Sequence, residues 1–329
     1  MTEAGPTIGD VAAEAGVSRA TVSRAFGRPR MLRPETVEHV LAVAGRLGYT
    51  PNRLARALST GRFGNLAVVV PDIANPFFPP MIRAAQGRAD RAGYAVFLGD
   101  ADEDPAREDV LLRQLGSQVE GFVLASSRMT DEQIRGHAER RPLVLVNRDV
   151  PGIPRVLIDT TRGVTEAVDH LAELGHRDIA YLGGPAGSWS NAQRRRAVRR
   201  AARRRGLALR MLAVRRPTFD EGRRSVTALL AGEVSAVVAF DDLVAQGVLA
   251  GLAERGVAVP AAFSVVGCDD VLGAQTYPPL TTVSARSAEA GTAAVELLTG
   301  RLTSGAAMAD TRLLLDTSLV LRATTAPPR

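Results

Sequence analysis

Two arginines on one short segment are the residues of this chain whose spacing points most directly to a chemistry. Residues 18–27 read SRATVSRAFG, and helical spacing predicts that Val22 and Phe26 face inward. The outer face then carries Arg19, Ala20, Ser23 and Arg24. An outward pair of cations on the second helix of a small helical unit is the layout of a helix-turn-helix DNA reader.

The flanking residues predict the two other helices of such a unit. Thr7 and Asp10 stand in the Thr-x-x-acid arrangement that can cap a helix start, and this first helix ends near Gly16. Pro34 suits the first position of a third helix. Its apolar stripe is expected to be Val37, Val40, Leu41, Ala44 and Leu47. We therefore expect an all-α domain over residues 1–50.

Charge is concentrated in the same part of the chain. Residues 1–62 contain nine Arg against five Asp or Glu, a difference of +4 in a chain whose formal charge is +6. All 41 basic residues are Arg, so the presence of an Arg at a given site does not by itself indicate a function. Only the position of an Arg within a predicted helix or strand can indicate one.

Composition excludes several classes of protein. The chain has 329 residues, 46% of them apolar and 23% charged, which favours two or three globular domains. Cys268 is its one cysteine and the four His are scattered, so we expect no disulfide, no metal site and no cofactor. The start MTEAGP lacks the features of a secretion signal, and no apolar run approaches the roughly 18 to 20 residues of a membrane span. A cytoplasmic protein with no membrane partner is expected.

From residue 65 onward, short apolar runs alternate with helical patterns. Five runs between residues 66 and 159 read as buried strands of a parallel sheet, and the alternation starts afresh with four runs between residues 179 and 269. The sequence thus predicts two similar α/β lobes in succession. Ligands of such sheets bind beyond the carboxyl ends of the strands, so the crevice between the lobes is the expected binding site.

Polar and aromatic residues follow those predicted strands. Asp241 and Asp269 stand at strand ends, where a carboxylate can accept ligand hydroxyl groups, and Asn147 and Arg148 end another strand. Phe77 and Phe219 are candidates for an aromatic wall, and polar groups above such a wall suit sugars and nucleobases. The alternative for each charged residue is a helix cap or an ion pair between lobes. Asp242 and Asp270 are interpreted as structural.

Several segments together resemble the lactose-repressor (LacI/GalR) family of bacterial transcription regulators. They are GVSRATVSRAF, LGYTPNRLARALSTGR and VVVPDIANPFF, then HLAELGHRDIAYLGGP, and finally VVAFDD with SVVGCDD and PPLTTV. The resemblance runs from about residue 7 to about residue 325. It implies a helix-turn-helix domain joined to an α/β two-lobed core of the periplasmic-binding-protein type.

The resemblance gives roles to the N-terminal residues. Arg19, Ala20 and Arg24 match positions that choose operator bases, since Arg can hold guanine with two hydrogen bonds and Ala can touch a thymine methyl. Phosphate contacts, which position without specifying, are assigned to Thr7, Ser18, Thr21 and Ser23. The alternative for Arg24 is a surface ion pair. Two residues depart from the family pattern: Gly27 replaces Asn, and Arg33 replaces a helix-capping Ser.

Residues 51–62 are expected to form a hinge helix and linker. The segment is too short to be a stable isolated helix, so we expect it to become helical only when it contacts a partner that stabilises it. The resemblance implies that Leu58 is wedged into a base step of the minor groove, while Asn52, Arg53 and Ala55 contact DNA. The alternative is that Leu58 covers the first lobe.

For the core at 63–329, the resemblance implies that the chain crosses between lobes three times. Lobe one is expected at about 63–159 and 284–311, and lobe two at about 160–283 and 312–326. Asp241, Asp269 and Arg195 match effector contacts. The run from 191 to 216, with eleven Arg and no acid, is interpreted as a solvated helix face, and the alternative is a second nucleic-acid surface.

These features predict a dimeric repressor of sugar or related catabolic genes that binds a palindromic double-stranded operator and answers to a small effector. The alternatives are a regulator controlled by a protein corepressor and a two-lobed solute-binding protein. An enzyme is disfavoured, because GSWSN at 187–191 lacks the second glycine of a nucleophile elbow and no phosphate-binding glycine loop is present. The sequence leaves open the effector, the direction of the response, the operator and its target genes, and dimer against tetramer.

Overall fold

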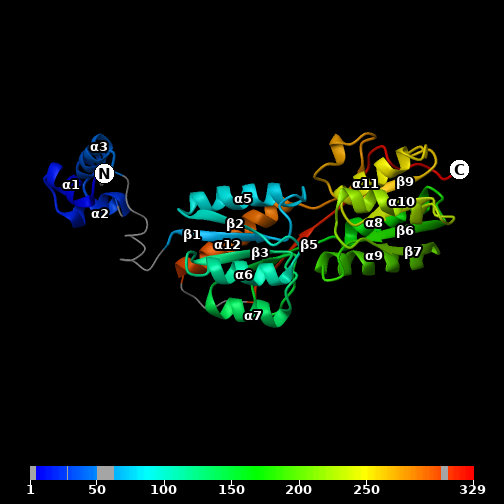
Figure 1. Ribbon diagram of the computed structural model, residues 1–329, viewed down its shortest axis with the longest axis horizontal. Helices are drawn as coiled ribbons and strands as arrows, with labels where there is room; N and C mark the ends of the chain where they lie inside the picture. Colours follow the sequence, from blue (N-terminus) through cyan, green and yellow to red (C-terminus); the bar gives the residue numbers. More distant parts are fainter. Residues whose placement is uncertain (1–4, 28, 50–62, 305–309) are drawn as a thin grey trace. The chain divides into compact units, whose positions relative to one another are not determined.

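The computed structural model describes residues 5–27, 29–49, 63–304 and 310–329. The chain divides into two compact units, Met1–Gly64 and Asn65–Arg329 (Figure 1). The residues expected in the hinge lie outside the described residues, and they are Asn52, Arg53, Ala55 and Leu58.

The described part of the N-terminal unit contains the three predicted helices. They are α1 (Ile8–Glu14), α2 (Arg19–Gly27) and α3 (Pro34–Leu47), with a 3-10 turn η1 (Pro29–Met31) before α3. The predicted capping box starts α1: the Thr7 hydroxyl accepts from the Asp10 amide at 3.4 Å, and the Asp10 carboxylate accepts from the Thr7 amide at 2.7 Å. At the start of α2, the Ser18 hydroxyl accepts from the Thr21 amide at 3.1 Å.

The core of this unit differs in one respect from the predicted stripe. Val40 and Ala44 are buried as expected, but Leu41 and Leu47 are exposed and Val43 is buried in their place. Because a helix turns by 100° per residue, Val43 lies on the same side as Val40, whereas Leu41 is rotated toward solvent. The prediction for Leu41 and Leu47 was therefore wrong.

Helix α3 begins at an N-cap, Arg33, whose side chain makes no cap hydrogen bond. Substitution Arg33→Ser is expected to stabilise α3 by about 1 kcal/mol, because the hydroxyl can accept from an otherwise unpaired amide of the first turn. Hydrogen exchange of the α3 amides in the full chain measures this effect. Arg30→Ser removes the same charge from η1 without adding a cap, so equal protection in both variants would contradict the explanation.

Lobe one of the larger unit is a parallel six-stranded sheet with helices on both faces. Its strand order is β11-β5-β4-β3-β1-β2. The strands are β1 (Asn65–Val70), β2 (Ala95–Asp100), β3 (Gly121–Ala125), β4 (Leu143–Val146), β5 (Arg155–Asp159) and β11 (Arg312–Asp316). Helices α5 (Phe78–Arg91) and α12 (Ser287–Ser304) cover one face, and α6 (Pro105–Leu115) and α7 (Asp131–Arg140) cover the other (Figure 1).

Lobe two repeats this three-layer architecture. Its sheet has the order β12-β10-β9-β8-β6-β7, and β12 pairs antiparallel with β10. The strands are β6 (Asp178–Gly183), β7 (Ala208–Ala213), β8 (Ala236–Ala239), β9 (Ser264–Asp269), β10 (Thr281–Ser284) and β12 (Leu319–Val320). Helices α8 (Thr161–Glu173) and α9 (Trp189–Arg205) cover one face, and α10 (Phe219–Leu229) and α11 (Asp242–Ala253) cover the other; a 3-10 turn, η2 (Gly273–Gln275), follows β9.

The chain crosses between the lobes three times, as the resemblance implies, but the last boundary is shifted. Residues 312–316 were expected in lobe two, yet β11 pairs in parallel with β5 of lobe one from Arg312 to Asp316. Without β11, β5 would be the edge strand of this sheet, and the pairing satisfies the backbone groups along that edge. The third crossing therefore falls at 317–318, between β11 and β12.

Candidate functional site

The outward face of α2 presents the residues predicted to contact DNA. Val22 and Ala25 point into the core, and Thr21 is half-buried. The exposed residues around them are Thr7, Ser18, Arg19, Ala20, Ser23 and Arg24. Within the described part of this unit the ion pair formed is Arg46 with Glu14 at 3.9 Å, and Arg24 forms none. The surface-ion-pair interpretation of Arg24 is thus not supported, and its contact with DNA stays a prediction.

The carboxyl ends of strands from both lobes meet at a polar crevice. Its cavity is only about 40 Å³, comparable to the space of one or two water molecules. The lining residues are Asn75, Phe77, Phe78, Glu103, Ser126, Arg128, Asn147, Ser188, Ser190, Arg194, Pro217, Phe240, Asp241 and Asp269.

Four of these residues have a backbone conformation that side chains with a Cβ rarely adopt. The φ angles are 59° at Glu103, 48° at Ser126, 51° at Asn147 and 119° at Asp269. Such positions cost free energy and gather at functional sites, where the surrounding structure holds them. Their concentration around this crevice makes it a candidate binding site.

Arg194 is the buried cation of the crevice. Its Nη2 donates to Asp269 Oδ1 at 2.9 Å, its Nη1 donates to the Phe240 carbonyl, and its guanidinium lies 4.9 Å from the centre of the Phe240 ring. Burial raises the pKa of Asp269, and the adjacent Arg194 opposes that rise. The pair offers a ligand both a fork of N–H donors and a carboxylate that accepts hydroxyl groups.

Asp241 links the two lobes. Its Oδ1 accepts from the Val244 amide at 2.8 Å and so caps α11, while its Oδ2 accepts from Asn75 Nδ2 of lobe one at 2.9 Å. Burial raises the pKa of Asp241 to about 6 despite these hydrogen bonds. The carboxyl therefore changes protonation close to neutral pH.

The raised pKa of Asp241 has a consequence for stability. A carboxyl whose pKa is higher in the folded state stabilises that state fully below its unfolded pKa, and this contribution is lost as pH rises through the folded value. The contribution of Asp241 to the free energy of unfolding is expected to fall between pH 4 and 6, by up to roughly 3 kcal/mol. Urea unfolding at several pH values measures the slope. Asp241→Asn should remove this contribution from the pH dependence, and a slope identical to that of the parent would contradict the assignment.

A second contact holds the lobes together near the same crevice. Arg216 of lobe two donates to the carboxylate of Asp102 of lobe one, and also to its carbonyl at 3.4 Å. On the lobe-one wall, Arg128 forms a two-pronged ion pair with Glu103, at 2.6 and 2.9 Å. With these contacts made and so small a cavity, a sugar-sized molecule can enter only when the lobes move apart.

The structure brings together four of the predicted effector residues and separates three others. Phe77, Asn147, Asp241 and Asp269 line the crevice. Arg148 does not, because its guanidinium donates to the Met129 carbonyl at 2.9 Å and to Asp131 at 2.8 Å. Phe219 lies in a different groove, described below.

Arg195 was predicted to contact the effector, but the neighbouring residue Arg194 lines the crevice instead. Arg194 occupies the crevice, whereas Arg195 is half-buried and outside the lining. The buried face of α9 contains Ala197, Val198 and Ala201, and a residue four positions before Val198 lies on that face. This periodicity was available in the sequence and selects Arg194.

Other lining residues were missed although a signal existed for some of them. Ser126 directly follows β3 as Asn147 follows β4, so the strand-end rule extends to it. Arg128 and Glu103 come from loops and have no local pattern. The two aspartates interpreted as structural do have structural roles: Asp242 accepts from Thr282 at 2.5 Å and from the Val271 amide at 3.0 Å, and Asp270 pairs with Arg322 at 2.6 Å.

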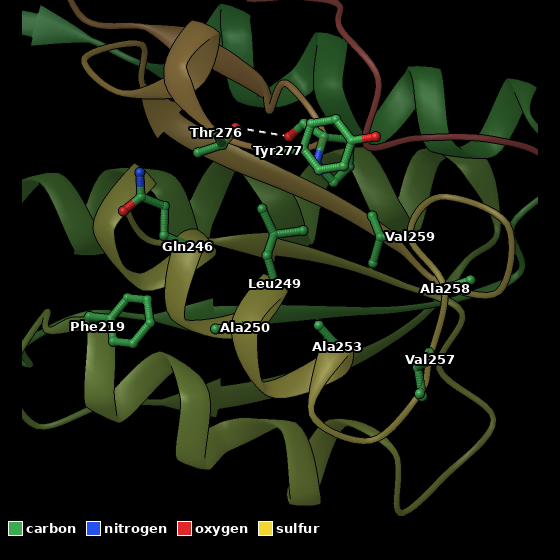
Figure 2. Close-up of a pocket in the computed structure, with 12 residues that line it drawn as sticks. Phe219, Gln246, Leu249, Ala250, Ala253, Val257, Ala258, Val259, Thr276 and Tyr277 are labelled. Carbon is green, nitrogen blue, oxygen red and sulfur yellow. Dashed lines mark hydrogen bonds between the residues drawn. The ribbon is translucent and has the colours of Figure 1, made fainter.

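A larger groove lies in lobe two, between α11 and the segment around Tyr277 (Figure 2). Its volume is about 600 Å³. Much of its lining is apolar, with Leu249, Ala250, Ala253, Val257, Val259 and Pro278. Tyr277 is 98% exposed and Phe219 is 40% exposed. Large apolar side chains so open to solvent beside one groove are typical of a protein interaction surface.

Among the described residues, no cluster of His, Cys, Asp and Glu could hold a metal ion. None of the described helices is both long and apolar enough to cross a membrane.

Comparison with known proteins gives matches over nearly the whole chain. The family model of "Bacterial regulatory proteins, lacI family" matches residues 7–52, and that of the "Periplasmic binding protein-like domain" matches residues 168–325. The HTH-type transcriptional regulator DegA of Bacillus subtilis is 31% identical, with 98% of each chain covered. The HTH-type transcriptional repressor CytR of Escherichia coli is also 31% identical, covering 98% of this chain and 97% of its own.

Solved structures agree with these matches. The lac repressor dimer bound to operator and the anti-inducer ONPF has a TM-score of 0.86 at 26% identity and covers 98% of this chain and 100% of its own. The complex of the transcriptional regulator CelR with cellobiose has a TM-score of 0.72 at 29% identity, with 97% and 99% covered. The helix-turn-helix unit, the two-lobed core and the full-length relatives together show that this chain belongs to the lacI family of bacterial regulatory proteins.

Proposed function

We propose that this protein is a transcriptional regulator that binds a palindromic operator as a homodimer and represses genes of sugar or related catabolism. A small effector, a sugar or a nucleobase-like molecule, sets its affinity for DNA from the crevice. The observation that carries the proposal is the presence, in one chain, of an exposed Arg and Ala face on α2 and of a buried Arg194–Asp269 pair between two lobes. Related regulators whose structures contain ribose or cellobiose support a sugar as the effector.

The proposal divides the work among three parts of the chain. Residues 1–50 read the operator, residues 51–62 form the hinge with Leu58 as the wedge, and residues 63–329 bind effector and dimerise. An effector moves the balance between open and closed lobes only by its different affinity for the two states. Closure around Asp241 and Asp269 shifts lobe one relative to lobe two, and lobe one is directly joined to the hinge. No catalytic activity is assigned, and regulation of bacterial genes implies action in the cytoplasm.

We assign the groove beside Tyr277 to the dimer contact of lobe two. Its rim exposes Tyr277 and Phe219, and its wall is formed by Leu249 and Ala253 of α11 (Figure 2). A second copy of the same chain would cover these side chains in an isologous contact, where each protomer inserts the same residues into its partner. The operator-bound lac repressor, described as a dimer, supports a dimer as the assembly.

Selection of bound duplexes from a random pool tests the proposal. The expected result is a palindromic consensus, two protomers per duplex and an affinity that falls steeply with salt. Arg24→Ala is expected to relax base preference at one position in each half-site, at a cost of about 1 to 3 kcal/mol. One protomer per duplex, or an affinity independent of salt, would overturn the proposal.

A further inference from the structure

A second polar cavity lies at the junction of the two lobes, apart from the crevice. Its volume is about 200 Å³, five times that of the crevice. Lobe one contributes Asp149 and Arg312, and helix α9 of lobe two contributes Trp189, Gln193, Arg196 and Arg200. None of these residues lines the crevice or the groove beside Tyr277.

The charge of this cavity is strongly positive. Its one carboxylate, Asp149, already accepts from Arg155 and from Arg312, the latter at 3.2 Å. Within the part of the chain that the structure describes, Arg196 and Arg200 have no ion-pair partner. The neighbouring Arg204 and Arg205 show the contrast, because both are paired with carboxylates of α8.

Both unpaired arginines are exposed residues of α9 that line the cavity. Arg196 and Arg200 are four residues apart, so they lie on the same face of α9 and repel each other. An anion between them would remove that repulsion, and a guanidinium binds phosphate or carboxylate oxygens with two parallel hydrogen bonds. Arg312 approaches the same space from lobe one.

An aromatic side chain completes the cavity. Trp189, the first residue of α9, is half-buried and lines the wall together with Gln193. Gln193 is held in place, because its Oε1 accepts from the Thr160 amide at 3.1 Å and hydroxyl at 2.8 Å, and its Nε2 donates to Asp159 at 3.1 Å. A fixed wall with a flat indole suits a ligand that has a ring as well as an anionic group.

We propose that this cavity is a second small-molecule site, which takes a compact organic phosphate with a planar or ring-shaped body. Arg196 and Arg200 bind the phosphate, Arg312 adds a contact from lobe one, and Trp189 packs against the ring. Because its residues come from both lobes, an occupied site holds one relative position of the lobes. The regulatory consequence rests on the proposed function, whereas the binding itself does not.

Trp189 is the one tryptophan of the chain, so its fluorescence reports directly on this cavity. The experiment titrates the full-length protein, without DNA, with phenyl phosphate, inorganic phosphate and phenol at constant ionic strength. The expected result is a saturable change of Trp189 emission with phenyl phosphate, a weaker response to inorganic phosphate and none to phenol. Arg196→Ala and Arg200→Ala are each expected to weaken phenyl phosphate binding at least tenfold.

Arg199→Ala is the matched control. Arg199 is an exposed arginine of the same helix that does not line the cavity, so its loss removes the same charge without removing a predicted contact. Affinity within twofold of the parent is expected. Equal weakening by Arg199→Ala and Arg196→Ala would show only general attraction to a basic face and would overturn the site. A linear, unsaturable response would overturn it too. Failure of these tests leaves DNA binding by the protein unaffected, so the two proposals fail separately.

Discussion

Replacing Arg194 with alanine is expected to destabilise the larger unit by about 3 to 5 kcal/mol, because the change leaves Asp269 buried without its partner. The variant also loses the hydrogen bond to the Phe240 carbonyl and the contact with the Phe240 ring. Urea unfolding of the full chain measures the loss. Arg195→Ala is the control, since Arg195 lies beside Arg194 but outside the crevice, and a change within about 0.5 kcal/mol is expected.

A double variant separates the structural role of this pair from its role in ligand binding. Arg194→Met combined with Asp269→Leu replaces both charges by apolar groups, and such replacements of buried ion pairs are often neutral in stability. The double variant is therefore expected to regain most of the stability but none of the effector response. A double variant as unstable as Arg194→Ala would show that the pair is not an isolated unit.

The second large effect is expected at the groove beside Tyr277. Tyr277→Asp places a charge at the centre of the proposed dimer contact, on a side chain so exposed that folding of the protomer is unaffected. Sedimentation is expected to show monomers. Operator affinity should fall by at least about 100-fold, because the helix-turn-helix domains that bind the two half-sites are no longer joined in one dimer.

The control for this variant is Leu321→Asp. Leu321 is another exposed apolar residue of the core, and it does not line the groove. This variant should remain dimeric and keep its operator affinity within a few fold. If Tyr277→Asp also remained dimeric, the dimer contact would have to lie elsewhere on the chain.

The sequence predicted those parts of the fold that depend on a local pattern, such as a capping motif or an apolar run. Thr7 and Asp10 form the expected capping box, and the nine apolar runs of the core became strands. Leu41 and β11 show where local rules are insufficient. Leu41 is apolar and lies one residue from the buried stripe of α3, but its side chain faces solvent. Strand β11 belongs to lobe one because it pairs with β5, and such a long-range pairing cannot be read from the local sequence.

The candidate site follows the same division. Asn147, Asp241 and Asp269 were predicted to lie together because each stands at the end of a predicted strand, and all three line the crevice. Arg128 and Glu103 were missed because they come from loops that are brought together only by the fold. The shift from Arg195 to Arg194 came from transferring a family position through an arginine-rich run, where the inward periodicity of Ala197, Val198 and Ala201 is the better guide.

The central claim is that occupancy of the crevice and DNA binding are coupled, and a linkage measurement tests it most directly. Ribose and cellobiose head a panel of sugars and nucleosides whose binding is measured by calorimetry with and without operator. For the sugar or nucleoside that binds, the factor by which it changes operator affinity must equal the factor by which operator changes its own affinity.

The decisive comparison uses Asp269→Asn in the same two assays. Its operator affinity without effector is expected to stay within a few fold of the parent, while effector binding and the change in operator affinity are both lost. A variant that binds the effector normally but has lost operator binding would contradict the account, and Asp269 would then be explained by its pairing with Arg194 alone.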